Sequence, residues 1–228
     1  MAGHPTKTII ACRTLIEEFD SFRTCGMRIE ALASGLHLHA DRLRGALQER
    51  IDKVTGLTET IVVGYGMCSM GVIGLKAGQS TLVIPRADDC IGILLGTREA
   101  YKDALRKRPG TYFLSKGWIK AGITLVDDLQ RMEARYGKHR AHLVMKRMLR
   151  HYRYLAFLDT GKPDEEGYRS FARKAAEMLG LTYGTIRGTR AILQKMVEGP
   201  WDGDFVVKAP GQQVTLNDFG MGNAGEVK

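Results

Sequence analysis

Short apolar segments alternate with amphipathic segments along most of the chain. Residues 8–11, 60–64 and 81–84 are rich in β-branched side chains, which is typical of buried strands. Residues 41–54 instead repeat apolar side chains at the spacing of an amphipathic helix. Strands that alternate with helices pair in parallel through right-handed crossovers. The pattern therefore predicts an α/β fold, a Rossmann-like open parallel sheet with flanking helices.

The same alternation resumes in the second half of the chain. Apolar segments at 111–114, 154–158 and 181–186 are separated by amphipathic stretches, and the pattern therefore repeats that of the first half. Two successive sets of strands and helices are consistent with two similar α/β halves. We place the sub-boundary between them near residues 110–120.

The C-terminal stretch differs in kind from the rest. Phe205–Lys208 and Gln213–Leu216 flank Pro210-Gly211, a pattern that predicts a terminal hairpin. The glycine-rich residues that follow predict a loose tail. We therefore expect one α/β domain at residues 1–198, with a hairpin and tail at 199–228.

Composition and charge narrow the partners that can be expected. The formal net charge of +9 favours a small anionic molecule or another anionic partner. No segment approaches the roughly 18 uninterrupted apolar residues of a membrane helix, so a membrane partner is not expected. The N-terminal residues lack the apolar core of a signal peptide, and we expect a cytoplasmic protein. A homo-oligomer remains open.

Cysteines supply the most informative chemistry. The chain has four, none of them in a CxxC pair, so a zinc ribbon or finger is not indicated. Cys12, Cys68 and Cys90 each follow an expected strand, and the carboxyl ends of parallel strands form the ligand crevice of such sheets. We therefore expect the three thiols to meet. Clustered thiolates suit zinc or an iron–sulfur cluster such as 4Fe–4S, and three protein ligands leave one coordination position open.

A nucleophilic cysteine is the competing chemical interpretation. Cys90 lies at the expected start of a helix over residues 90–106, whose dipole favours a thiolate, although Asp88 and Asp89 oppose it by like charge. The two aspartates are candidate acid/base groups, and either could instead cap that helix. His37 could serve as a base or as a fourth metal ligand.

Substrate contacts are expected at the same edge of the sheet. Arg13 and Arg86 could hold a carboxylate or a phosphate by paired hydrogen bonds. Gly66 lies in a glycine-rich turn whose backbone can approach a ligand closely. Tyr65 and Tyr112 could line the pocket, although aromatic residues at such positions are as often part of a core.

Five motifs resemble an uncharacterised family, number 1638 among the domains of unknown function. They are Ile10-Ala-Cys12, Gly35-Leu-His37, Gly64-Tyr-Gly66-x-Cys68, Pro85-Arg-Ala-Asp-Asp-Cys90 and Pro109-Gly-Thr-Tyr112. The likeness extends to about Leu181. Members of that family tend to carry a histidine where this chain has Asp88 or Asp89. The motifs centre on the three cysteines and His37, so the resemblance implies that these residues form one site.

The resemblance also implies a metabolic context. Members often occur near genes for corrinoid-dependent methyl transfer from methylamines and betaines, which suggests one-carbon metabolism. The leading hypothesis is a metal-dependent enzyme, a transferase or lyase, that acts on a small anionic or methylated substrate. The alternative is an accessory or metal-carrier protein whose partner is a corrinoid protein or methyltransferase.

A third hypothesis concerns the basic stretch from Arg131 to Arg153. Tyr136, Tyr152 and Tyr154 interleave there with basic residues and could stack on the bases of a single-stranded nucleic acid. The stretch matches no recognised nucleic-acid-binding module, so nucleic acid is the least expected partner. Solvated helix faces explain many such charge runs.

Overall fold

The structure is a computed structural model that describes three stretches of the chain: residues 6–22, 26–162 and 165–221. Cys25, Pro163 and the last residues of the expected tail lie outside the described residues. The chain divides into two compact units. Unit 1 comprises residues 1–98 and 190–228, and unit 2 comprises residues 99–189.

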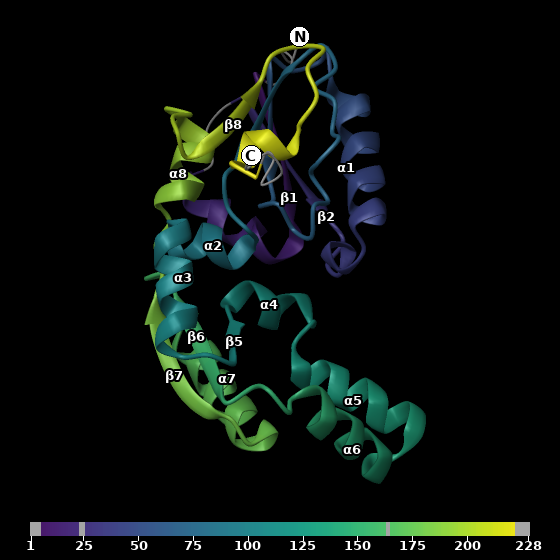
Figure 1. Ribbon diagram of the computed structural model, residues 1–228, viewed down its shortest axis with the longest axis vertical. Helices are drawn as coiled ribbons and strands as arrows, with labels where there is room; N and C mark the ends of the chain where they lie inside the picture. Colours follow the sequence, from purple (N-terminus) through teal and green to yellow (C-terminus); the bar gives the residue numbers. More distant parts are fainter. Residues whose placement is uncertain (1–5, 23–25, 163–164, 222–228) are drawn as a thin grey trace, which may run out of the picture. The chain divides into compact units, whose positions relative to one another are not determined.

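Unit 1 contains a five-stranded, mostly parallel sheet (Figure 1). Its strands, in spatial order, are β2 (Met27–Leu32), β1 (Lys7–Cys12), β3 (Thr60–Gly64), β4 (Thr81–Pro85) and β8 (Phe205–Lys208). The first four strands are parallel, with Ile10 of β1 opposite Val63 of β3, and β8 joins antiparallel to β4. The predicted α/β class with a parallel sheet is therefore confirmed.

Helices cover both faces of this sheet, because alternate strand residues point to opposite faces. They are η1 (Arg13–Phe22), η2 (Leu36–Leu38), α1 (Ala40–Val54), α2 (Cys90–Leu95), α8 (Ala191–Glu198) and η3 (Leu216–Phe219). On the α1 face, Leu43, Leu47 and Ile51 are fully buried against strand residues such as Ile10. Burying each such side chain stabilises the fold by about 1.5–3 kcal/mol.

The helical segments that follow β1 and β4 both depart from a single regular α-helix. The segment after β1 winds as a 3-10 helix, with Leu15 and Phe19 buried as their spacing suggests. The helix expected over residues 90–106 is broken into α2 and α3 (Arg98–Lys107). The break follows from Gly96, whose φ of 87° ends α2 in the left-handed conformation that glycine tolerates best.

The C-terminal stretch does not form the expected hairpin. β8 pairs with β4, and residues 211–214 lie along residues 74–78. The Gly211 amide donates to the Gly78 carbonyl at 2.8 Å, and the Val214 amide donates to the Leu75 carbonyl at 2.9 Å. The boundary expected at residue 198 thus does not coincide with the observed division. The physical reason is that Phe205, Val206 and Val214 bury their side chains in unit 1 instead of against one another.

Unit 2 has a smaller, all-parallel sheet in the order β5 (Thr111–Leu114), β6 (Tyr154–Asp159), β7 (Thr182–Arg187). Its other helices are α4 (Lys116–Ala121), α5 (Leu125–Tyr136), α6 (Lys138–Met148) and α7 (Glu166–Leu179). Helices α5 and α6 pack side by side as a hairpin (Figure 1). A capping box begins α5, in which Thr124 and Asp127 satisfy each other's backbone amides.

Candidate functional site

The strand order of unit 1 contains a topological switch point. The chain proceeds from β1 to β2 in one direction and from β3 to β4 in the other, so a crevice is expected between the carboxyl ends of β1 and β3. Cys12 is the last residue of β1, Cys68 follows the end of β3, and Cys90 begins α2 after β4. All three are free cysteines. The described part of the chain therefore has its thiols at the edge where such folds bind ligands.

Two loops hold Cys68 and Cys90 next to each other. The Met67 amide donates to the Ala87 carbonyl at 2.8 Å, and the Cys68 amide donates to the Asp88 carbonyl at 2.9 Å. Gly66 permits this approach, because a Cβ there would lie 2.6 Å from the Ala87 carbonyl oxygen. Gly66 is thus required for the packing of one loop on the other.

The three thiols form one group, which we call the thiol cluster: Cys12 and Cys68 are buried, and Cys90 is partly exposed. Burial raises the pKa of Cys68 to about 12, and the nearby Asp89 and Cys12 act in the same direction. Burial likewise raises the pKa of Cys90 well above its usual value. The nearby Cys68, Cys12 and Asp89 raise it further, by smaller amounts. Each thiol pair is therefore close enough to interact. At neutral pH, Cys68 and Cys90 are protonated.

Tyr65 adds a phenol to the thiol cluster. Its side chain is 2% exposed, and its hydroxyl forms no hydrogen bond of good geometry among the described residues, although the Cys12 thiol lies beside it. Burial raises the pKa of Tyr65, and the neighbouring Cys12 contributes in the same direction. A buried hydroxyl is usually hydrogen-bonded in native proteins. Its protonated state leaves it able to donate to a group bound beside the sulfur atoms.

The backbone at Cys68 is unusual. Cys68, Ser69 and Met70 have φ values of 42°, 56° and 69°, so three successive residues other than glycine adopt the left-handed conformation. Each such residue costs roughly 1–2 kcal/mol. Backbone strain of this kind concentrates at functional sites, where the surrounding structure holds it in place. The strain therefore marks the loop of Cys68 as a functional candidate independently of its thiol.

His37 and Asp89 lie near each other at the same edge. Burial lowers the pKa of His37, while the charge of Asp89 opposes this effect. Asp89 caps α2, since one carboxylate oxygen accepts from the Ile91 amide at 2.9 Å and from the Gly92 amide at 3.0 Å. Asp89 is therefore the helix cap, and it also contributes to the electrostatics of the thiol cluster.

The remaining charged candidates have other contacts. Asp88 forms an ion pair with Arg98 at 2.7 Å. Arg86 donates to the Phe205 carbonyl at 3.0 Å and to the Asp218 carbonyl, so its guanidinium fastens the C-terminal segment. Arg13 is exposed and forms no ion pair within the described part of the chain. Of the two predicted anion-binding arginines, Arg13 is thus the one left available.

Tyr112 belongs to unit 2. It is a residue of β5, and its ring packs edge-on against Tyr152 with ring centroids 6.3 Å apart. Burial raises the pKa of Tyr112 to about 12. These contacts account for Tyr112 as part of the packing of unit 2.

Thr14 was not anticipated from the sequence. Its hydroxyl is buried and donates to the Cys12 sulfur at 3.2 Å. The only sequence signal was a hydroxyl residue two positions after a cysteine, which has no specificity alone. Thr14 orients the Cys12 sulfur and would stabilise charge on it.

The three thiols are ligands that suit a soft metal, but they are not arranged to bind one metal ion together. Within residues 6–22, 26–162 and 165–221, no group of three His, Cys, Asp or Glu side chains is placed to hold one metal ion. A mononuclear zinc site would need the three sulfurs to converge at about 2.3 Å from one point. Thiolates that bind separate iron atoms of a cluster are spaced more widely.

Fold and site together define an α/β protein with a Rossmann-like parallel sheet and a buried thiol cluster at its switch point. The family described as "Protein of unknown function (DUF1638)" matches residues 31–197, and the chain belongs to that family. The matched stretch includes His37, Cys68 and Cys90, and it begins after Cys12. No curated protein and no solved structure matches the chain. Within the described residues, every helix is too short or too polar to span a membrane.

Proposed function

We propose that Cys12, Cys68 and Cys90 hold a metal centre, of which a 4Fe–4S cluster is the form that we favour, in an enzyme acting on a small anionic or methylated substrate. The observation that carries the proposal is the mutual proximity of three free thiols at the switch point of a parallel sheet. A single buried cysteine is commonly just a small apolar residue. Three that influence one another beside an unpartnered phenol are not explained by packing alone.

The protonation of the thiols favours a metal over a nucleophilic cysteine. A catalytic cysteine needs a lowered pKa, usually from a nearby cation or helix N-terminus. Here burial raises the pKa of Cys68 to about 12 and raises that of Cys90 as well. A bound metal would supply the missing positive charge, and its binding would release the thiol protons.

We favour a cluster over zinc because the two metal centres make different demands on their ligands. Each thiolate of a cluster binds a different iron atom, whereas all ligands of zinc must converge on one ion. Among the described residues, no three side chains converge in that way. With three protein ligands, a 4Fe–4S cluster would leave one iron open to bind substrate.

The surrounding residues suggest defined roles. The Tyr65 hydroxyl retains its proton, because its pKa is raised, and it would donate a hydrogen bond to a group bound beside the sulfurs. His37 is neutral at pH 7, since its pKa is lowered, and it could accept a proton near Asp89. Arg13, next to Cys12 in the chain, offers a guanidinium to an anionic substrate.

Anaerobic purification tests the metal centre. We expect the wild-type protein to contain iron and acid-labile sulfide, with visible absorption that weakens on reduction and is lost when prolonged exposure to air breaks the cluster down. Cys68→Ala should lose the iron and the absorption, while Cys25→Ala, which changes none of the three proposed ligands, should retain both. Thr14→Val should retain iron and alter the reduction potential, since only a hydrogen bond to the Cys12 sulfur is lost.

The outcomes separate the alternatives. Zinc in place of iron, lost in Cys68→Ala, would keep the metal site and change its identity. Absence of both metals after reconstitution with iron and sulfide, or their retention in Cys68→Ala, would exclude the proposal. An accessory or carrier role would instead be indicated by transfer of the metal centre to a corrinoid methyltransferase without turnover of any small substrate.

A further inference from the structure

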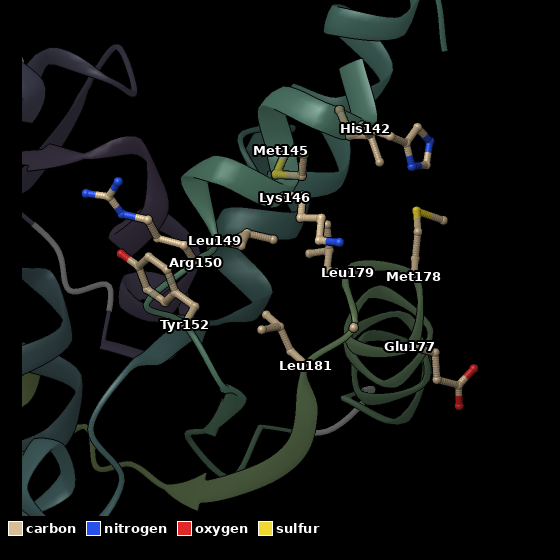
Figure 2. Close-up of a pocket in the computed structure, with 12 residues that line it drawn as sticks. His142, Met145, Lys146, Leu149, Arg150, Tyr152, Glu177, Met178, Leu179 and Leu181 are labelled. Carbon is tan, nitrogen blue, oxygen red and sulfur yellow. The ribbon is translucent and has the colours of Figure 1, made fainter. Parts of the chain in front are cut away.

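Unit 2 contains a pocket that is unconnected with the thiol chemistry. It lies between α6, the end of α7 and the start of β7, and its volume is about 590 Å³ (Figure 2). Small-molecule sites typically have volumes of about 300–1,000 Å³ and combine apolar walls with a few polar groups. We call it the basic pocket, because side chains of the basic stretch line it.

The inner surface of the basic pocket is apolar. Leu129, Met145 and Leu149 are buried and form a small cluster with Leu179. Met178 lies at the rim with 56% of its surface exposed. This lining offers an environment for an aliphatic or aromatic ligand body, whose burial would be favourable by about 25 cal/mol per Å².

One wall carries positive charge. His142, Lys146 and Arg150 follow one another at intervals of one helical turn, so they line the same side. His142 already contacts Glu133 at 2.7 Å, and Arg150 donates to His151 at 2.8 Å. Lys146 has no ion pair in the described ranges. Figure 2 shows its ammonium group projecting across the pocket toward Leu179.

Negative charge is scarce at this wall. Glu177 is the only acidic residue among those that line the pocket in the described part of the chain. Figure 2 shows its carboxylate directed away from Lys146. The ammonium of Lys146 is therefore left uncompensated beside an apolar surface.

We propose that the basic pocket binds a small amphipathic organic anion, a carboxylate or phosphate ester with an apolar body. Lys146 would pair with the anionic group, and the leucine and methionine side chains would bury the body. This division of roles matches the arrangement of the pocket, in which Lys146 and Arg150, neither of them in an ion pair within the described residues, border an apolar floor.

The same observations count against a single-stranded nucleic acid at this surface. Stacking platforms need exposed aromatic faces. The Tyr152 ring packs against Tyr112, and the Arg108 guanidinium lies 5.8 Å from the centre of the Tyr154 ring. The Arg135 guanidinium likewise lies 5.2 Å from the centre of the Tyr136 ring, so all three tyrosines in the basic stretch already contact other side chains.

A pair of fluorescent probes tests the proposal. Anilinonaphthalene sulfonate is an amphipathic anion, and N-phenylnaphthylamine has the same apolar body without the sulfonate. We expect saturable binding of the sulfonate at one site. Lys146→Met should weaken it about tenfold, because a charge-assisted contact is lost. Lys146→Arg should retain binding, and the neutral probe should respond to neither substitution.

Arg147→Met is the matched control. It removes one positive charge from the same helix at an exposed position that does not line the pocket. We expect a change of less than about twofold, because screened charges outside the site act weakly. With methyl-labelled methionine, the NMR signals of Met145 and Met178 should shift on titration while those of the other methionines stay in place.

Several results would overturn the proposal. Equal weakening in Lys146→Met and Arg147→Met would show a diffuse charge effect. Sulfonate binding that is not saturable, or that leaves Met145 and Met178 unshifted, would place the probe elsewhere. Displacement by a single-stranded oligonucleotide, with a steep salt dependence and equal sensitivity to both substitutions, would assign the surface to nucleic acid instead.

Discussion

The thiol cluster of unit 1 and the basic pocket of unit 2 differ in the charge of their side chains before any ligand binds. In the thiol cluster, burial raises the pKa of Cys68 and Cys90, so these side chains stay neutral until a ligand brings charge. In the basic pocket, Lys146 is charged beforehand and lacks an ion-pair partner in the described residues. The first region is suited to receive a cation, and the second is suited to receive an anion.

The thiol cluster and the basic pocket also differ in the backbone structure that carries their side chains. Cys68 sits in a left-handed backbone turn fastened by hydrogen bonds to the loop of Ala87 and Asp88. Lys146 lies on the side of a regular helix. Substitutions around the thiol cluster should therefore affect stability strongly, and substitutions in the basic pocket should affect binding with little effect on stability.

The largest expected effect concerns thiol reactivity. In metal-free protein at about pH 8, a pKa of about 12 in place of 9 leaves Cys68 with about a thousandfold less thiolate than an ordinary thiol. We expect its alkylation by iodoacetamide to be slower by at least this factor than in urea. Residue-resolved mass spectrometry would measure it. Fast alkylation of Cys68 or Cys90 in the folded protein would restore the nucleophile hypothesis.

The next largest effect is on stability, and it concerns the contact between the loop of Gly66 and the loop of Ala87 and Asp89. Gly66→Ala places a methyl group 2.7 Å from the Asp89 backbone nitrogen, so we expect a loss of about 3 kcal/mol in the free energy of unfolding. Gly45→Ala is the control, because its added methyl group meets no atom within 4 Å and the position is helical. It should stabilise the protein by about 0.5–1 kcal/mol. Urea denaturation measures both, and equal values would contradict the close approach of the two loops at Gly66.

The two adjacent aspartates provide a finer comparison. Asp89→Ala removes the cap of α2 and should cost about 1–2 kcal/mol, whereas Asp89→Asn should retain stability because asparagine also caps helices. Asp88→Ala removes a partly exposed ion pair with Arg98 and should cost less than about 1 kcal/mol. Thermal unfolding of the three variants decides the order. A larger cost at Asp88 would mean that its partner contributes more than exposed pairs usually do.

The smallest expected effect is in the basic pocket. Lys146→Met should change the free energy of unfolding by less than about 0.5 kcal/mol, because the ammonium has no ion pair to lose among the described residues. Chemical denaturation at low ionic strength would reveal any hidden contribution. A loss comparable to that of Asp89→Ala would assign Lys146 a structural role and remove the contrast between the two regions.

Much of unit 1 follows from local patterns. The β-branched segments form the parallel strands, and the apolar spacing of residues 41–54 forms α1. The position of Asp89 before an apolar run indicates the helix cap that is observed. The strands, α1 and the cap of α2 each depend on residues that are close in the sequence. The spacing of apolar and polar residues is therefore sufficient to predict them.

Other features depend on segments far apart in the chain. The pairing of β8 with β4 involves residues such as Phe205 and Pro85, and no local pattern distinguishes it from a hairpin. The contacts of Arg86 with the C-terminal segment have the same origin. The basic pocket is equally non-local, since Lys146 and Leu179 come from different helices.

The sequence alone determined that Cys12, Cys68 and Cys90 each lie at or shortly after the end of a strand, because hydrophobic periodicity indicates where these strands lie. Tertiary structure decided that Cys12, Cys68 and Cys90 share one buried region, since that depends on strand order and on the close approach that Gly66 permits. It also decided that the pKa values of Cys68 and Cys90 are raised. A thiol's pKa is set by burial and by neighbours distant in the chain, and the linear sequence does not encode these as a local pattern.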